Sequence, residues 1–234
     1  MNDKPGHLTF DSENLAVPEI HTHEAQAEEK TEEAQAAGIV FDNLAMPEIH
    51  IVHKQSMPEG GVRMSFAKQQ EVDKILAFYR KVIDAVNQTD VKLGWNIEIY
   101  PNREFVEEAV EKGQMCILAA DGEILAAAVV NHTVNKEYDA IGWKVRTPES
   151  KIATIHALAT LPSCRGKQTA DSFLTQIESY CKSQGDLAIH LDVIDTNVPA
   201  YKMYLRNGYS ERDCVEMYYE VVGTREFWML EKVL

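Results

Sequence analysis

The chain has 234 residues, a net charge of -14 and 45% hydrophobic residues, which favours one domain with its own core plus an extension. No apolar run approaches the roughly 18 residues that a membrane helix needs, so we expect no membrane partner. The excess of acidic residues likewise predicts no nucleic acid as a partner, because binding to a phosphate backbone needs clustered Lys and Arg.

Residues 1–61 differ in composition from the rest of the chain, with twelve acidic and three basic residues. Within them, residues 10–21 return in shortened form as residues 41–50, on either side of a spacer rich in Glu, Ala and Gln. The spacer offers little apolar surface to bury. We therefore predict an acidic extension, flexible or used for docking, whose duplicated short motif binds a protein partner or the catalytic domain itself.

The first residues lack the basic-then-apolar layout of a secretory signal, and the four cysteines form neither a CxxC pair nor a dense framework. We therefore expect reduced thiols in a cytoplasmic protein. His21, His23, His50 and His53 follow the two repeats, but no third ligand stands at a fixed spacing. We accordingly predict no metal site.

The second domain is predicted to span residues 62–234, after Gly60 and Gly61. Apolar residues at three-and-four spacing predict a helix over residues 69–86. In chain order the remaining elements are a strand at 62–66 before that helix, then a helix at 102–112, strands at 115–120, 124–131 and 152–161, a helix at 169–184, a strand at 187–194, a helix at 199–207 and strands at 215–222 and 226–233. Antiparallel hairpins mixed with one βαβ crossover indicate an α+β fold.

A basic loop opens the predicted helix at 169–184. The loop and the first helical residues are Arg165, Gly166, Lys167, Gln168, Thr169 and Ala170. Backbone N–H groups at such a turn are unpaired, and the helix dipole adds positive potential, so this combination binds phosphate oxygens. The two basic side chains suit a pyrophosphate better than a lone carboxylate.

This segment resembles the acetyl-CoA motif of the GNAT acetyltransferase family, Arg/Gln-x-x-Gly-x-Gly/Ala, except that Gln168 stands where the family has Gly. A Gln side chain there predicts crowding of the phosphate or a different path of the loop. About thirty residues downstream, a second stretch resembles the next motif of the family; its matching residues are Asn197, Ala200, Tyr201 and Tyr204, before Gly208 and Tyr209. The resemblance is closest to small bacterial stand-alone members.

The resemblance covers about three quarters of the chain. It implies the GNAT acyl-CoA N-acyltransferase fold, a mixed, mostly antiparallel sheet with flanking helices, and acetyl-CoA as co-substrate. It also implies N-acetyl transfer by direct attack of a primary amine, from a small molecule or a peptide, on the thioester. Tyr204 matches the position of the acid that protonates the departing thiolate.

In the family the fourth and fifth strands separate, and a backbone N–H there polarises the thioester carbonyl. In this chain that N–H is expected at Leu158, Ala159 or Thr160. His156 and Asp192 lie on the strands that flank the expected gap, and either is a candidate general base. The alternatives are a satisfied histidine packed in the sheet and, for Tyr204, an aromatic residue of the core.

Four aromatic residues match positions that this subgroup keeps aromatic: Trp95, Tyr100, Tyr138 and Trp143. They line an amine pocket through cation–π contact or belong to the core. Two other functions compete with acetyl transfer, namely a GNAT-fold module that binds acyl-CoA without turnover and a protein that acts through its extension. A homodimer is a further candidate assembly.

Overall fold

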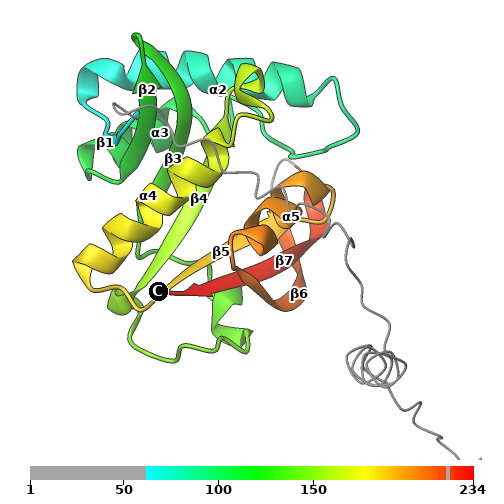
Figure 1. Ribbon diagram of the computed structural model, residues 1–234. Coiled ribbons are helices and arrows are strands. Elements are labelled where there is room, and N and C mark those ends of the chain that lie inside the picture. Colours follow the sequence, from blue (N-terminus) through cyan, green and yellow to red (C-terminus); the bar gives the residue numbers. More distant parts are fainter. Residues whose placement is uncertain (1–61, 220–221) are drawn as a thin grey trace, which may run out of the picture. The chain divides into compact units, whose positions relative to one another are not determined.

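The computed structural model describes residues 62–219 and 222–234, so the predicted extension and its repeated motif lie outside the described residues. The described residues form a seven-stranded sheet of order β1-β2-β3-β4-β5-β7-β6 (Figure 1). Within it β4 and β5 are parallel, and the other neighbouring strands are antiparallel. The predicted mixed, mostly antiparallel sheet with flanking helices is thereby confirmed.

The helices are α2 (Val72–Val86), α3 (Arg103–Glu111), α4 (Thr169–Gln184) and α5 (Val198–Arg206). The strands are β1 (Met64–Phe66), β2 (Met115–Ala120), β3 (Glu123–Asn131), β4 (Ile152–Thr160), β5 (Ala188–Ile194), β6 (Ser210–Tyr219) and β7 (Gly223–Val233). These bounds lie within a few residues of the predicted ones, except that β6 begins at Ser210 instead of residue 215.

The early start of β6 has a tertiary cause. Its first residues are polar and mostly exposed, so their sequence does not favour a strand. They nevertheless pair with β7, and Ser210 lies opposite Glu231. The backbone of the neighbouring strand thus extends β6 beyond what its own residues predict.

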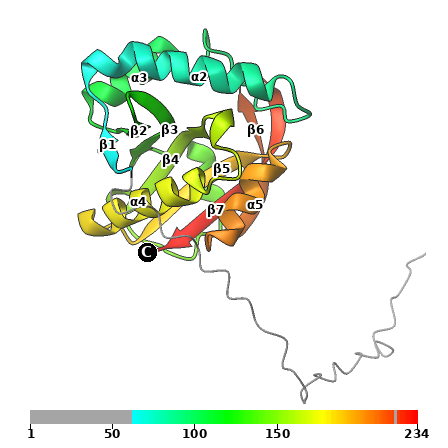
Figure 2. The ribbon, with the colours of Figure 1, turned by 45° about the horizontal axis from the view of Figure 1, so that its top comes forward.

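Separate apolar clusters cover the two faces of the sheet. One joins α2 and α3 to the sheet and includes the fully buried Ile75 and Val106. The other joins α4 and α5 to the opposite face and includes Phe173 and Leu174. Figure 2 shows α2 and α3 together on one side, with α4 and α5 on the other. None of the described helices is long and apolar enough to cross a membrane.

Strands β4 and β5 run together for only three residue pairs. Thr154 and His190 form the last of these pairs. Beyond it β4 continues to Thr160 beside β3, and β5 continues to Ile194 beside β7. The separation of the fourth and fifth strands that the sequence predicts is therefore present.

Candidate active site

A β-bulge lies within the part of β4 that β5 does not pair. Residues 157 and 158 together face Ala128 of β3. Ala157 has a left-handed backbone, with φ of 50°, and its carbonyl accepts a hydrogen bond of 2.9 Å from the Tyr79 hydroxyl. The N–H group that is predicted to polarise the thioester lies within residues 158–160. On the side that faces β5, none of the described strands pairs with this part of β4.

The basic loop turns directly into α4, as predicted. Within the described part of the chain, several of its N–H groups have no hydrogen-bond acceptor: those of Gly166, Gln168, Thr169 and Ala170. The side chains of Arg165 and Lys167 are exposed beside them. Free N–H groups, the positive end of α4 and two cations fit the pyrophosphate of a coenzyme A thioester.

Gln168 takes a left-handed conformation, with φ of 56° and ψ of 17°. A residue other than glycine pays roughly 1–2 kcal/mol for this conformation, whereas glycine adopts it freely. The loop therefore follows a path that suits glycine in spite of the Gln side chain, which is exposed. The sequence predicts either crowding of the phosphate or a different path of the loop. The glycine-like dihedral angles favour the first, with an added side chain at the phosphate site.

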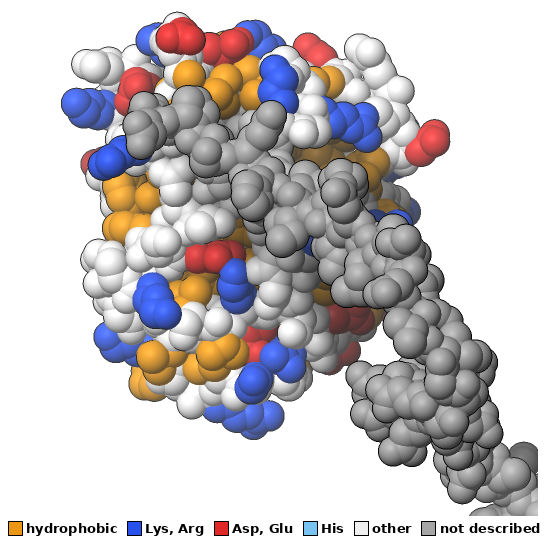
Figure 3. Space-filling view, in the orientation of Figure 1, with side chains coloured by type: hydrophobic (Ala, Val, Ile, Leu, Met, Phe, Trp, Pro, Cys, Tyr) orange, Lys and Arg blue, Asp and Glu red, His pale blue; other side chains and the backbone are white. Residues whose placement is uncertain are grey.

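Charges of both signs are interspersed with apolar side chains over the visible part of the face in Figure 3. The visible face therefore carries no continuous field of one sign.

Helix α5 carries Tyr204 and begins at a side-chain cap. The Asn197 side chain accepts a hydrogen bond of 3.3 Å from the backbone N–H of Ala200. Tyr204 is 6% exposed and packs edge-on against Tyr209, with 5.2 Å between the ring centroids. Burial, and then the charge of Asp192, raise the pKa of Tyr204 well above its ordinary value. Its hydroxyl therefore stays protonated at neutral pH, as an acid must.

Asp192 on β5 lies among tyrosine side chains. The Tyr138 hydroxyl donates a hydrogen bond of 2.8 Å to Asp192 Oδ2. Burial raises the pKa of Tyr100, Tyr204 and Tyr219, and the charge of Asp192 raises it further. Burial likewise raises the pKa of the Asp192 carboxyl above its ordinary value, against the effect of the Tyr138 hydrogen bond. The group accepts a proton more readily than an exposed carboxylate does.

His156, the other candidate base, lies on β4 and shares a face with Asp192 by strand alternation. Its Nε2 is 3.1 Å from both Asn131 Oδ1 and the Thr133 carbonyl oxygen. Both partners are acceptors, so we assign the proton of the neutral ring to Nε2, which leaves Nδ1 as the basic nitrogen. Burial lowers the pKa of His156, although the hydrogen bond to Thr133 opposes this. The ring is neutral at neutral pH.

The four predicted pocket aromatics fall into two groups. Trp95 and Tyr100 pack together in a T shape, with 6.3 Å between the ring centroids, against the cluster under α2 and α3. Tyr138 and Trp143 instead line a pocket of about 270 Å³. The core alternative therefore fits Trp95, whereas Tyr100 also lies close enough to Asp192 to feel its charge.

Three predicted cofactor-binding residues make packing contacts in this structure: Ala170, Ala200 and Tyr201. Ala170 and Ala200 pack against the apolar cluster under α4 and α5, where small side chains let the helices approach closely. The Tyr201 hydroxyl hydrogen-bonds Glu211 of β6, and its ring packs on Trp228 of β7 at 4.3 Å. These contacts fix α5 against the sheet.

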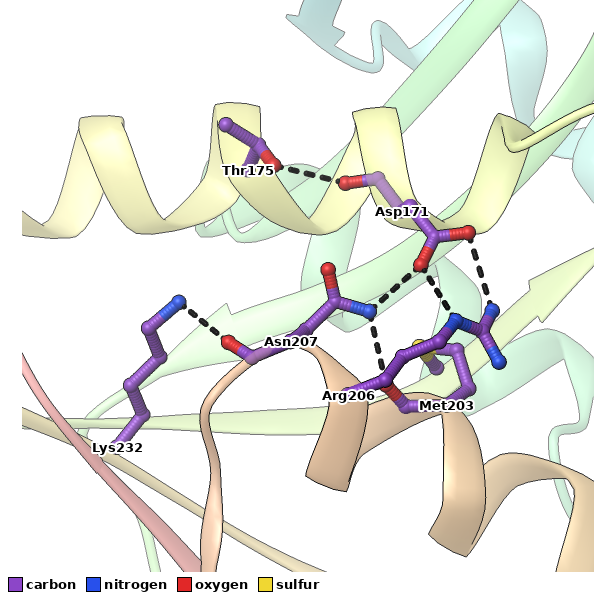
Figure 4. Close-up of polar contacts among 6 residues, drawn as sticks. All are labelled: Asp171, Thr175, Met203, Arg206, Asn207 and Lys232. Carbon is purple, nitrogen blue, oxygen red and sulfur yellow. Dashed lines mark hydrogen bonds and ion pairs between the residues drawn. The ribbon is translucent and has the colours of Figure 1, made fainter. Parts of the chain in front are cut away.

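A polar network joins the first turn of α4 to the end of α5 (Figure 4). Asp171 accepts two hydrogen bonds of 3.0 Å from Arg206 and one of 2.7 Å from Asn207. Lys232 of β7 donates a further bond of 2.7 Å to the Asn207 carbonyl. The network ties the helix that follows the basic loop to the helix that carries Tyr204.

Three buried or partly buried polar residues around the site were not predicted from the sequence: Tyr79, Tyr219 and Glu231. Tyr79 supports the bulge, and Tyr219 lies near Asp192. Glu231 is buried in β7 after a run of apolar residues. The sequence does contain one signal for such residues, which is a hydroxyl or carboxylate at a position that the apolar pattern assigns to the core. A polar group buried there needs a hydrogen-bond partner.

Comparisons with known proteins agree with this geometry. Residues 82–209, more than half of the chain, match the model of the acetyltransferase (GNAT) family. No curated protein sequence matches the chain. Among solved structures, a GNAT-family acetyltransferase from Streptococcus agalactiae is similar with a TM-score of 0.63 and 19% identity, over 74% of this chain and 96% of that one.

Two further structures have the same fold. The PaiA N-acetyltransferase from Thermoplasma acidophilum, in complex with coenzyme A, has a TM-score of 0.55 and 15% identity over 74% of this chain and 99% of its own. The ribosomal-protein-S18-alanine N-acetyltransferase from Escherichia coli has a TM-score of 0.52 and 13% identity over 73% and 92%. With its basic loop, separated strands and matching family model, the chain belongs to the GNAT acetyltransferase family and is an acyltransferase.

Proposed function

We propose that the protein transfers the acetyl group of acetyl-CoA to a primary amine of a small molecule or peptide, by direct attack and without an acyl-enzyme. The observation that carries this proposal is the separation of β4 and β5, with Asp192 on β5 and Tyr204 on α5 close enough for the charge of Asp192 to raise the pKa of Tyr204. One group has a raised affinity for a proton, and the other keeps its proton at neutral pH. Such a pair supplies a base and an acid for one reaction.

The cofactor is held by the basic loop and the start of α4. The free N–H groups of Gly166, Gln168, Thr169 and Ala170, with the side chains of Arg165 and Lys167, bind the pyrophosphate. The thioester end enters between β4 and β5, and an N–H within residues 158–160 donates to its carbonyl oxygen. The structure of the PaiA enzyme with coenzyme A supports this choice of cofactor class.

The chemistry removes two protons from the acceptor ammonium and supplies one to the thiolate. Asp192 takes the first proton, and the free amine nitrogen attacks the thioester carbon. The carbon–sulfur bond of the resulting tetrahedral species then breaks, and Tyr204 gives its proton to the departing thiolate. The nitrogen loses its second proton to the Tyr204 oxygen, which restores the hydroxyl and leaves the neutral acetylated amide.

An amine panel tests this function directly. Release of free CoA thiol from acetyl-CoA should rise above background with at least one class among free amino acids, polyamines, peptide N-termini and simple alkyl amines. Product mass should increase by one acetyl group. If the protein binds CoA tightly and no member of a broad panel is acetylated, the alternative of a non-catalytic acyl-CoA-binding module is correct.

The cofactor loop gives a separate prediction. Arg165→Glu should weaken CoA binding about 10- to 100-fold, because a charge-assisted contact contributes roughly 1.5–3 kcal/mol and the new carboxylate also repels the phosphates. Isothermal titration with CoA measures the change. Arg80→Glu on α2 is the matched control, since Arg80 is equally exposed but lies on a helix of the opposite face. Unchanged affinity in Arg165→Glu would place the pyrophosphate elsewhere.

The extension gives another prediction. Deleting residues 1–60 should leave an active acetyltransferase, because β1 to β7 and every proposed site residue lie beyond them. The truncated protein should instead lose a protein partner or weaken in self-association, since two copies of a docking motif gain avidity. Pull-down and light scattering measure this. A truncated chain that does not fold would make the extension part of the core, and unchanged binding and assembly would refute docking.

A further inference from the structure

Glu231 of β7 is 1% exposed and binds four groups from three parts of the chain. Its Oε2 accepts from the Lys144 N–H at 3.0 Å, and its Oε1 accepts from the Val145 N–H at 2.9 Å. His190 Nε2 lies 3.2 Å from Oε1, and Arg212 Nε lies 2.7 Å from Oε2. Burial alone would raise the pKa of this carboxyl, but these partners hold it below its ordinary value.

A buried carboxylate is not needed for stability at such a position, because an apolar side chain of similar volume commonly stabilises a fold as well or better. The carboxylate instead provides two oxygen atoms that accept hydrogen bonds in defined positions. It fixes two consecutive backbone N–H groups of an irregular segment that no strand of the described chain pairs. The segment before β4 is thereby held against β5 and β7.

The same contacts continue to the reaction centre. The Trp143 ring stacks on His190, with 3.7 Å between the ring centroids, and its Nε1 donates a hydrogen bond of 2.9 Å to the Tyr138 carbonyl. The Tyr138 hydroxyl in turn donates a hydrogen bond to Asp192. A continuous set of contacts therefore leads from Glu231 through the segment at 143–145 to the proposed base.

Tyr138, Trp143, Val145 and His190 also line the half-open pocket of about 270 Å³. Polar and apolar atoms share its surface about equally, and six of its ten lining residues are apolar or aromatic: Val134, Tyr138, Ile141, Trp143, Val145 and Ile152. The charged residues on its lining, Asp139 and Arg146, are exposed. Because Tyr138 belongs both to this wall and to the Asp192 contact, an amine at Asp192 has the pocket beside it.

We propose that Glu231 is a positioning residue that holds residues 143–145 as a wall of this pocket, and that the pocket takes a compact apolar group of the acceptor amine. The inference rests on the proposed function, since it places the amine of the same molecule at Asp192. Glu231 itself touches no reacting atom. Its effect is on where the acceptor binds and which acceptor binds best.

Glu231→Gln tests the positioning role, because the amide keeps the volume of the carboxylate but has only one oxygen to accept hydrogen bonds. The N–H groups of Lys144 and Val145 should exchange with solvent at least tenfold faster in the full chain. The KM for phenylethylamine should rise about tenfold. The KM for ethanolamine, which lacks the apolar group, should stay within about twofold, as should kcat and the affinity for CoA.

Arg212→Gln is the matched control. It breaks the same buried ion pair, with its 2.7 Å contact, but leaves the carboxylate bound to both N–H groups. It should change neither the exchange rates nor the ratio of the two KM values. If Glu231→Gln does not fold, Trp143→Leu tests the same wall from the segment itself and should raise the KM for phenylethylamine alone.

Unchanged exchange in Glu231→Gln would overturn the positioning role, and an equal rise of KM for both amines would overturn the apolar specificity. Acetylation of neither amine by the unaltered protein would also overturn that specificity. The exchange measurement needs no turnover. Faster exchange without acetylation of any amine would therefore uphold the positioning role and refute the proposed function.

Discussion

Tyr204→Phe is expected to lower kcat by about 10²- to 10³-fold, within the usual contribution of a general acid, and to leave the KM for acetyl-CoA nearly unchanged. The hydroxyl acts on the thiolate that forms only as the carbon–sulfur bond breaks, so its loss removes stabilisation of the transition state and not of the bound cofactor. Thiol release in a single turnover at saturating acetyl-CoA measures the chemical step directly.

Tyr209→Phe provides the matched control for this experiment. Tyr209 is buried as deeply as Tyr204, and the two rings pack on each other at 5.2 Å. Both substitutions therefore remove one hydroxyl from the same aromatic pair, but only Tyr204 has its pKa raised by the charge of Asp192. If both variants keep the unaltered rate, Tyr204 is a packing residue. If both lose the same amount, the effect is one of stability.

Local signals explain why most of the fold follows from the sequence. The predicted helix at 102–112 is α3, and its start is fixed by Asn102, whose side chain caps the N–H of Phe105 at 2.9 Å. Gly185 ends α4 in a left-handed conformation, as a glycine after a helix usually does. Both signals act within a few residues of the chain. The start of β6 depends instead on pairing with β7, and it was predicted wrongly.

The site likewise combines features set by short local patterns with features set by contacts between distant residues. The basic loop and the Asn197 cap were readable because each is a short continuous pattern. The Tyr138–Asp192 hydrogen bond joins residues 54 positions apart, so no spacing rule places those side chains together. Glu231 is a more distant case, since the segment that it binds lies 86 and 87 residues earlier. A buried acid in a strand indicates that a partner exists, but only the folded chain identifies it.

The bulge in β4 could not be predicted from the sequence either. Ala157 adopts its positive φ because β3 has one residue opposite two of β4 and because the Tyr79 hydroxyl binds its carbonyl. Nothing in the string Ile-His-Ala-Leu-Ala marks that position. The consequence bears on the proposed chemistry, since the bulge lies directly before the last residues of the uncovered strand edge, where the carbonyl-polarising N–H is predicted.

Asp192→Asn should reduce kcat/KM by about 10²-fold or more, the usual cost of losing a general base. The amide keeps its oxygen for the Tyr138 hydroxyl, which limits structural change, but it cannot accept the proton of the amine. His156→Gln should cost less than about tenfold, because a Gln side chain can still donate to the Asn131 and Thr133 oxygens. Isothermal titration with CoA should give similar affinities for both variants.

The pH dependence of kcat/KM identifies the base independently of these magnitudes. A base works when deprotonated, so activity falls as the pH drops through its pKa. Burial raises the pKa of Asp192 above 3.8 and lowers that of His156 below 6.5, so the pH of the acid limb does not by itself say which group is the base. When one amine serves all variants, its own titration cancels in the ratio of variant to unaltered protein. We expect the limb to vanish in Asp192→Asn and to persist in His156→Gln, and the reverse result would make His156 the base.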